Sequence, residues 1–207
     1  MDNIEIINIA LSHLGAGNIQ NLTEGSNESK AANVYYDITR RAVLQKYNWS
    51  FATKVESLAL LTEQPRDFAF AYQLPTDMVK VINIVPETEH YYPKGNSSAF
   101  EIRGTQLLTD VEDANIVYVY DDEDTNTFDD MFINAFSHYL ASQMAIRITK
   151  DRDLQVTELE IYNSIISEAG ASTLNQDKER KDENPYVTAR GATCTDNCFD
   201  VNCNYTY

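Results

Sequence analysis

The spacing of apolar residues changes twice along this chain, and these changes constrain its fold more than any other feature. From residue 3 to about 47, and again from about 128 to 169, apolar residues recur every three or four positions, as on one face of a helix. Between about 52 and 120 they form short runs with some alternation, separated by turn residues, which is typical of strands. Strands gathered in the middle of the chain, with helices before and after them, indicate an α+β fold with an antiparallel sheet.

Two helices are predicted before the strands, over residues 3–14 and 27–47. The apolar face of the first consists of Ile4, Ile7, Leu11 and Leu14. Gly15 follows it as a C-terminal cap, and either Ser26 or Asn27 caps the start of the second. The predicted inward face of the second helix consists of Ala31, Val34, Tyr35, Ile38, Ala42 and Gln45. We expect these two helices to form an antiparallel pair.

Two more helices are predicted after the strands, over residues 128–149 and 153–169. The first opens on Thr127 and Asp130, which have the spacing of a capping box. It is apolar on more than one side, so we expect it to be the central helix of the domain. A polar turn at 150–152 leads into the last helix. The predicted inward stripe of that helix consists of Leu159, Tyr162, Ile166 and Ala169.

Six short segments between the helix pairs are predicted to be strands. They span residues 52–60, 68–74, 79–85, 100–103, 106–109 and 115–120. Gly104 and Thr105 stand between two of them and favour a tight hairpin turn. Leu74-Pro75-Thr76-Asp77 interrupts the series and is predicted to begin a helical turn with Pro at its first position.

The length and charge of the chain limit its class. With 207 residues, of which 43% are hydrophobic, it suits one domain at 1–175 followed by an extended tail at 176–207. Its net charge of −16 argues against wrapping nucleic-acid phosphates or binding an anionic membrane. No window has the run of about 18 apolar residues that a membrane span needs. The N-terminus lacks a basic segment, so we expect no signal peptide and a cytosolic origin.

Residues that could carry chemistry are few. The histidines are His13, His90 and His138, and none forms a recognisable triad or a metal pair at helical spacing. Asp122, Asp124 and Asn126 have calcium-loop spacing, but Thr127 and Ile133 occupy the positions that need Gly and Glu. Cys194, Cys198 and Cys203 lack a fourth zinc ligand and are expected to be free thiols. We therefore expect no catalytic residue, cofactor or metal.

An ordered series of segments across residues 3–175 resembles one family. The segments are Leu14-Gly15, Lys30-Ala31-Ala32, Asn48-Trp49-Ser50-Phe51-Ala52, Tyr72-Gln73-Leu74-Pro75-Thr76-Asp77, Phe100-Glu101-Ile102-Arg103-Gly104, Val117-Tyr118-Val119-Tyr120 and Phe128-Asp129-Asp130-Met131-Phe132. Their order and spacing resemble the tail tubular protein A group of short-tailed bacteriophages. The segment after Asn184 matches nothing expected of that group.

The resemblance implies a structural virion protein in the neck or tail, made in the host cytoplasm. Such proteins are head-to-tail adaptors: twelve copies form a ring that joins the portal to the tail nozzle or tube. DNA passes through the ring without specific binding, and a net charge of −16 per subunit would discourage adhesion. Adaptors of this type reach into the portal with an extension. Expected partner-binding anchors in this tail are Pro185, Tyr186, Phe199, Tyr205 and Tyr207.

A second class of function stays open from the residues alone. A small virion-associated cell-wall hydrolase would need two carboxylates held about 5–10 Å apart in a cleft. Asp and Glu total 32 in this chain, but the sequence places no such pair. A structural protein without enzymatic activity is the first expectation.

Overall fold

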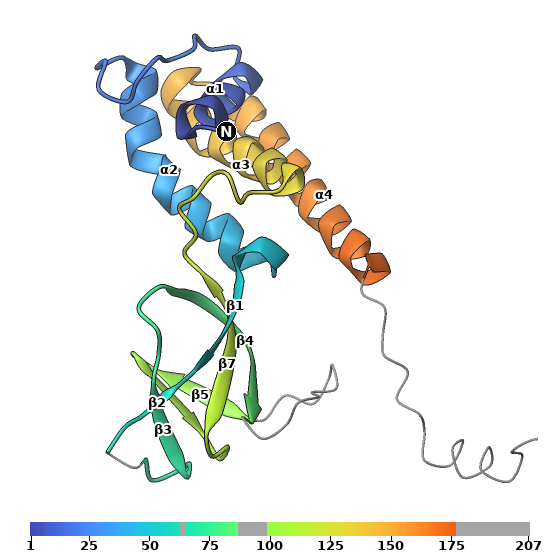
Figure 1. Cartoon of the computed structure of the whole chain (residues 1–207). Coiled ribbons are helices and arrows are strands. Elements are labelled where there is room, and N and C mark those ends of the chain that lie inside the picture. The colour runs from blue at the N-terminus through green and yellow to red at the C-terminus, as the bar shows by residue number, and fades with distance from the viewer. Residues whose placement is uncertain (63–64, 87–98, 177–207) are drawn as a thin grey trace, which may run out of the picture. The chain divides into compact units, whose positions relative to one another are not determined.

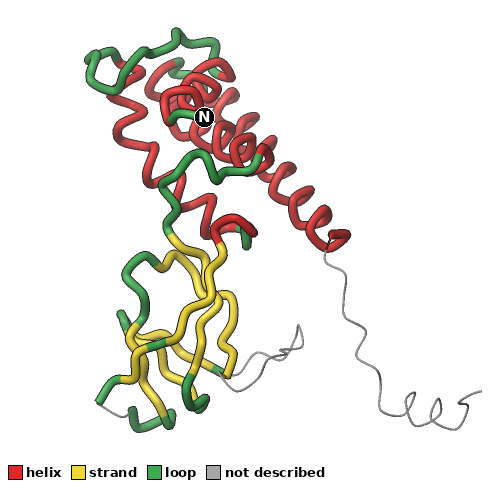
Figure 2. The backbone as a smooth tube through the Cα atoms, viewed as in Figure 1, coloured by secondary structure: helices red, strands yellow, loops and turns green. Residues whose placement is uncertain are grey.

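The computed structural model describes residues 1–62, 65–86 and 99–176 (Figures 1 and 2). The helices are α1 (Asn3–His13), α2 (Asn27–Lys46), the 3-10 turn η1 (Ser50–Ala52), α3 (Asp130–Ile148) and α4 (Arg152–Gln176). The strands are β1 (Thr53–Ser57), β2 (Ala59–Leu60), β3 (Phe70–Gln73), β4 (Met78–Pro86), β5 (Phe100–Arg103), β6 (Gln106–Thr109) and β7 (Ala114–Tyr120). The chain is α+β with antiparallel sheets, as its periodicity predicts, and Met1–Asn175 form one compact unit.

Side-chain oxygens start the first two helices. The Asp2 carboxylate accepts a hydrogen bond from Asn3 N, and Glu5 accepts one from Asp2 N at 2.8 Å, which completes a capping box. Ser26, one of the two expected candidates, caps α2 because its hydroxyl accepts from Ser29 N at 3.1 Å. Gly15 follows α1 with φ +62°, which confirms its role at the helix end.

The start of α3 differs from the prediction. Asp129 is the cap, and its carboxylate accepts from Phe132 N at 2.6 Å. The predicted capping box of Thr127 and Asp130 is wrong, because the Thr127 hydroxyl donates to the Asp122 carboxylate instead. The acidic loop before the helix competes for that hydroxyl, which the spacing alone does not reveal.

The last helix is longer than predicted. Helix α4 runs to Gln176 rather than ending at 169. Residues 170–176 carry few apolar side chains, so periodicity gives no signal there, but none of them is a proline that would stop the helix. At the other end, the Asp151 carboxylate accepts from Asp153 N and Leu154 N and caps the helix after the expected turn.

The inward face of α2 is the main error among the helix predictions. Val34 is 51% exposed and Ile38 is 68% exposed, although both were expected in the core. The buried positions are Ser29, Ala31, Ala32, Tyr36, Thr39, Arg40, Val43 and Leu44. A buried arginine breaks the apolar pattern at the centre of the true stripe. The sequence therefore favoured the neighbouring stripe, in which apolar residues are the larger share.

Helix α3 is buried on several sides, as expected for a central helix. Both α1 and α2 pack mainly on α3 rather than on each other, so the predicted α1–α2 pair is a minor contact. Buried α3 residues are Phe132, Ala135, Phe136, Ser137, Leu140, Ala141, Ser142, Met144 and Ala145. Helix α4 contacts α3 through the stacked rings of Tyr139 and Tyr162. The predicted α4 stripe is partly wrong: Leu159 is exposed, and Glu158 beside it is buried.

The strands form two antiparallel sheets with the orders β1-β7-β4 and β2-β3-β6-β5. The segment predicted as one strand over 52–60 is divided at Leu58, and its halves join different sheets. Where a helical turn was predicted, a single turn lies before β4, closed by the hydrogen bond that Met78 N donates to Pro75 O at 3.4 Å. The β5–β6 hairpin is present as predicted, with Gly104 at φ +63° in its turn.

One small core lies between the two sheets. Its buried residues are Leu58, Tyr72, Leu74, Ile84, Leu107, Ala114, Ile116 and Tyr118. A larger core joins the helices to η1, β7 and the segment before α3, and it includes Trp49, Val119 and Phe128. Across the described ranges, no helix has the length and apolar character to span a membrane.

Candidate interaction surface

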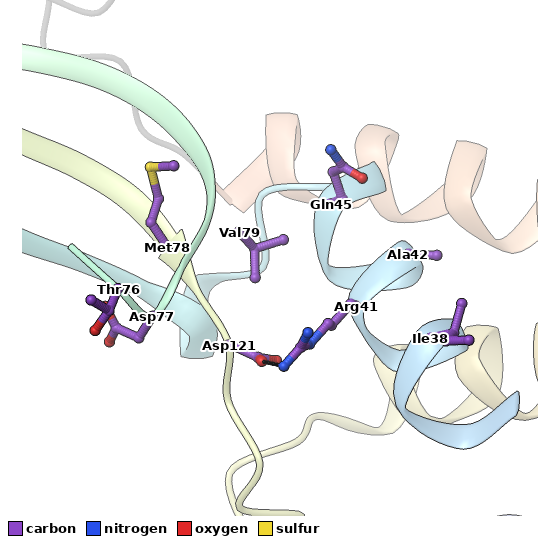
Figure 3. Close-up of a pocket in the computed structure, with 9 residues that line it drawn as sticks. All are labelled: Ile38, Arg41, Ala42, Gln45, Thr76, Asp77, Met78, Val79 and Asp121. Carbon is purple, nitrogen blue, oxygen red and sulfur yellow. Dashed lines mark ion pairs between the residues drawn. The ribbon is translucent and has the colours of Figure 1, made fainter. Parts of the chain in front are cut away.

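A hollow of about 500 Å³ lies between α2 and the turn that precedes β4 (Figure 3). Its lining residues are Ile38, Arg41, Ala42, Gln45, Thr76, Asp77, Met78, Val79 and Asp121. Figure 3 shows Val79 projecting from β4 into the space beside the helix and Arg41 reaching across to Asp121. Helix α2 thus contributes both apolar and polar side chains to the hollow, and Asp77 and Asp121 contribute carboxylates.

Two arginines of α2 share the carboxylate of Asp121. The Arg41 guanidinium lies 2.7 Å from one carboxylate oxygen and is largely exposed. Arg40 lies 2.8 Å from the other oxygen, and its side chain is only 2% exposed. Arg40 also donates to the carbonyl of Asp122, so its charge is held by a backbone oxygen as well as by the acid. This cluster ties α2 to the segment after β7.

The other acid of the hollow, Asp77, is engaged within the strand region. Its carboxylate accepts from Lys54 at 3.3 Å and from the Tyr118 hydroxyl at 3.1 Å. That hydroxyl also lies 2.9 Å from Glu56, and burial together with these two carboxylates raises the pKa of Tyr118. Lys54 lies over the Tyr120 ring, 3.5 Å from its centre. Each acid of the hollow therefore faces a cation, which is the arrangement of structural ion pairs and gives no specific support to a hydrolase.

The outer face of α2 continues from the hollow as a stripe of exposed side chains. We name it the α2 stripe and define it as Lys30, Val34, Ile38, Arg41 and Gln45. It combines two branched apolar residues with two cations, in a chain whose net charge is −16. Adjacent exposed apolar residues on one helix face are typical of a surface that contacts another protein.

The outer face of α4 carries a stripe of the opposite charge. We name it the α4 stripe and define it as Asp153, Val156, Glu160 and Ile161, all exposed. The helices α2 and α4 flank α3, so the two stripes belong to different faces of the helical region (Figure 1). An apolar and basic stripe on one face and an apolar and acidic stripe on another are complementary in charge.

A second cluster of polar side chains lies where α1, α3 and α4 meet. The rings of His13 and His138 stack with their centres 4.0 Å apart, and His138 Nδ1 lies 2.7 Å from the Glu158 carboxylate. Burial lowers the pKa of His13, and the neighbouring His138 lowers it further. These three residues are the ones in the described ranges that could hold a metal ion. Sequence spacing missed them because they come from three separate helices.

The acidic loop before α3 uses its carboxylates locally. Asp122 accepts from Asp124 N, the Tyr120 hydroxyl and the Thr127 hydroxyl, and Asp124 accepts from the amide and side chain of Asn126. The carboxylate oxygens thus shape the loop.

The sequence-predicted partner residues cannot be placed. Pro185, Tyr186, Phe199, Tyr205 and Tyr207, with the three cysteines and His90, lie outside the described residues. The α2 stripe was missed as a surface because its apolar residues were assigned to the core. No protein-family model matches the chain, and no curated protein matches its sequence.

Proposed function

We propose that this chain is a structural head-to-tail adaptor of a short-tailed bacteriophage. Twelve copies form a ring that joins the portal to the tail nozzle or tube and surrounds the DNA channel. The four helices form one bundle that faces the portal, and the strand region faces the tail. The observation that carries the proposal is the ordered series of family-like segments across residues 3–175.

Several of those segments lie where one helix or strand ends and the next begins. Trp49 is buried at the passage from α2 to β1, and its indole N–H donates to Val43 O at 3.0 Å. The segment ending at Asp77 forms the turn beside the hollow, and Gly104 makes the β5–β6 turn. The segment at 128–132 contains the cap of α3. The segments therefore lie at positions that determine how the helices and strands connect. This supports the interpretation of their order as a resemblance to the family.

A ring also needs two different faces on each subunit, because head-to-tail contacts join unlike surfaces. The α2 stripe and the α4 stripe supply such a pair, with apolar centres and opposite charges. In this proposal the α2 stripe of one subunit packs on the α4 stripe of its neighbour. Arg41 then contributes to the contact through its exposed guanidinium, while Arg40 holds the helix in place.

The acidic composition fits a channel protein. Sixteen excess negative charges per subunit would repel DNA phosphates wherever they line the channel. The tail residues Pro185, Tyr186, Phe199, Tyr205 and Tyr207 are proposed as anchors on the portal, since buried aromatic residues commonly dominate such contacts.

The test measures the mass of the purified full-length protein alone and after mixing with the portal ring of the same phage. We expect a portal-dependent gain of twelve chains. Ile38→Glu should reduce ring formation at least tenfold, because it places a carboxylate in the apolar centre of the α2 stripe. The matched control is Ile102→Glu, which changes another exposed isoleucine in the strand region and should assemble normally.

Circular dichroism of both variants must match the parent protein, since both positions are exposed. A parent protein that ignores the portal ring would overturn the adaptor proposal. Equal assembly of the two variants would leave the adaptor in place but remove the α2 stripe from its interface.

A further inference from the structure

We propose that His13, His138 and Glu158 form a binding site for one transition-metal dication, and that zinc suits their donor set best. The site joins the C-terminal end of α1 to the middle of α3 and the first half of α4. This inference is independent of the adaptor proposal, because it rests on the geometry of three helices and not on any partner.

The donor atoms are already close together. One ligand atom from each residue lies within 4.8 Å of the other two. Two ligands of a tetrahedral zinc ion are about 3.3 Å apart when the bonds are about 2.0–2.1 Å. The pair formed by His138 Nδ1 and Glu158 Oε2, at 2.7 Å, would have to open slightly, and His13 would have to approach. The His13 and His138 rings, which stack with an angle of 19° between their planes, would also have to turn apart, because the lone pair of each ring nitrogen lies in the plane of its ring.

The chemistry of the set is specific. Imidazole nitrogen is a preferred ligand of zinc, copper, iron and nickel, and two histidines with one carboxylate are a recurrent protein site for zinc and for non-haem iron. The set carries one negative charge when both imidazoles are neutral, so a dication would also compensate the buried carboxylate. Calcium and magnesium are poorer fits because they prefer oxygen ligands.

The setting of Glu158 supports a bound cation. Its side chain is only 7% exposed, although carboxylates are rarely buried without a charged partner. In the described part of the chain, its ion-pair partner is His138, whose charge depends on protonation. A metal ion at this point would give the carboxylate a partner with a permanent charge.

The surroundings of His13 would orient it. Ser137 donates its hydroxyl hydrogen to Asn134 O at 2.9 Å, so the lone pairs of its oxygen remain available. That oxygen lies 3.4 Å from His13 Nε2. An oxygen acceptor beside one ring nitrogen is the usual device for aligning an imidazole that binds a metal through its other nitrogen. Neither histidine is fully buried, which leaves a path for the ion.

The test is titration of the chelator-treated full-length protein with zinc and cobalt(II), followed by calorimetry and by the visible absorption of cobalt. The three cysteines could bind these ions independently, so a parallel variant carries Cys194→Ser, Cys198→Ser and Cys203→Ser. We expect one equivalent of metal to bind that variant with cobalt bands typical of four or five ligands. At free zinc one hundred times the Kd, the Tm should rise by roughly 5–10 °C.

Ligand variants locate the site. In the cysteine-free background, His13→Ala should weaken binding more than tenfold, and Glu158→Gln, which preserves size, should do the same. His90→Ala is the matched control and should bind as the parent does. Absence of binding to the cysteine-free protein would overturn the proposal, as would equal binding by the parent and both ligand variants. Circular dichroism of the metal-free variants verifies that each is folded, and one folded ligand variant is sufficient for the decision.

Discussion

The helical and strand regions of this molecule handle buried polar groups in different ways. The helical region encloses whole charged side chains, Arg40 and Glu158, and each links elements far apart in the chain. The strand region buries the rings of Tyr72 and Tyr118 but directs their hydroxyls to acceptors near its rim, Val111 O and two carboxylates. Strands are already joined by backbone hydrogen bonds, whereas helices satisfy theirs internally and depend on side chains for every connection.

The two cores also differ in size and in kind. Edge-to-face aromatic contacts dominate the helical core, where Phe132 contacts Trp49, Phe51 and Phe128 with ring centres 4.7–5.1 Å apart. Among the described residues, the strand core has eight buried members, of which six are aliphatic and two are tyrosines. We therefore expect the helical core to supply more of the stability, and the following experiments test that difference.

The largest effect is expected at Phe132, which is fully buried in the aromatic cluster. Phe132→Ala should lower the free energy of unfolding by about 4 kcal/mol, because it removes a ring and leaves a cavity. Leu107→Ala, at an equally buried position between the sheets, should cost about 3 kcal/mol. Urea unfolding followed by far-UV circular dichroism and by the fluorescence of Trp49, the single tryptophan, measures both. A greater loss at Leu107 would reverse the comparison.

The next effect separates the two arginines that share Asp121. Arg40→Ala should destabilise the protein by about 3 kcal/mol, because it leaves a mostly buried carboxylate without its inner partner. Arg41→Ala should cost under about 1 kcal/mol, since its side chain is 61% exposed and screened by water. Equilibrium unfolding at low and high salt distinguishes them: only the Arg41 effect should fade with salt. Equal losses at both positions would show that burial does not decide the strength of this cluster.

The smallest changes in the free energy of unfolding should come from removing single tyrosine hydroxyls, and they should have opposite signs in the helical and strand regions. The buried hydroxyl of Tyr36 in α2 has no hydrogen-bond partner in the described part of the chain. Tyr36→Phe should therefore stabilise the protein by about 1 kcal/mol. Tyr72→Phe should destabilise it by about 1 kcal/mol, because it removes the 2.9 Å hydrogen bond to Val111 O. Thermal and urea unfolding at pH 7 give both values, and a loss of stability in Tyr36→Phe would point to a hidden partner.

The same variant has a predictable response to alkali. Burial raises the pKa of Tyr36 to about 12, whereas an unfolded tyrosine titrates near 10. Between pH 10 and 12 the unfolded chain ionises this phenol, whereas the folded protein keeps it protonated. The free energy of unfolding of the parent protein therefore falls as the pH rises from 10 toward 12. The advantage of Tyr36→Phe over the parent protein should widen across this interval.

The element order and fold class were predictable because periodicity is a local signal. The Gly104 hairpin, the Ser26 cap and the central position of α3 follow from short segments and are confirmed. The predictions that were wrong concern faces whose burial depends on residues distant in the sequence. The buried face of α2 includes Arg40, whose partner Asp121 lies beyond seven strands, and Glu158 is buried because of His138. No local pattern predicts that a charged residue will be buried.

The exposed stripe on α2 and the three-helix cluster could not be predicted for the same reason. Val34 and Ile38 were assigned to the core on hydrophobicity alone, and only packing shows that they face outward. The three-helix cluster was invisible because His13, His138 and Glu158 have no common spacing in the sequence. The adaptor function remains a prediction that the experiments with the portal ring can decide.

The pairing of β1 with β7 has a consequence for how this chain can change over time. Thr53 is the register partner of Val119, so the chain enters and leaves the strand region at adjacent points. In genetic terms, this region is a cassette: two crossovers, one at each of its ends, could exchange it while the end of α2 and the loop before α3 stay within reach of a short linker. The helical region could then be inherited unchanged while the strand region diversifies to match different binding partners.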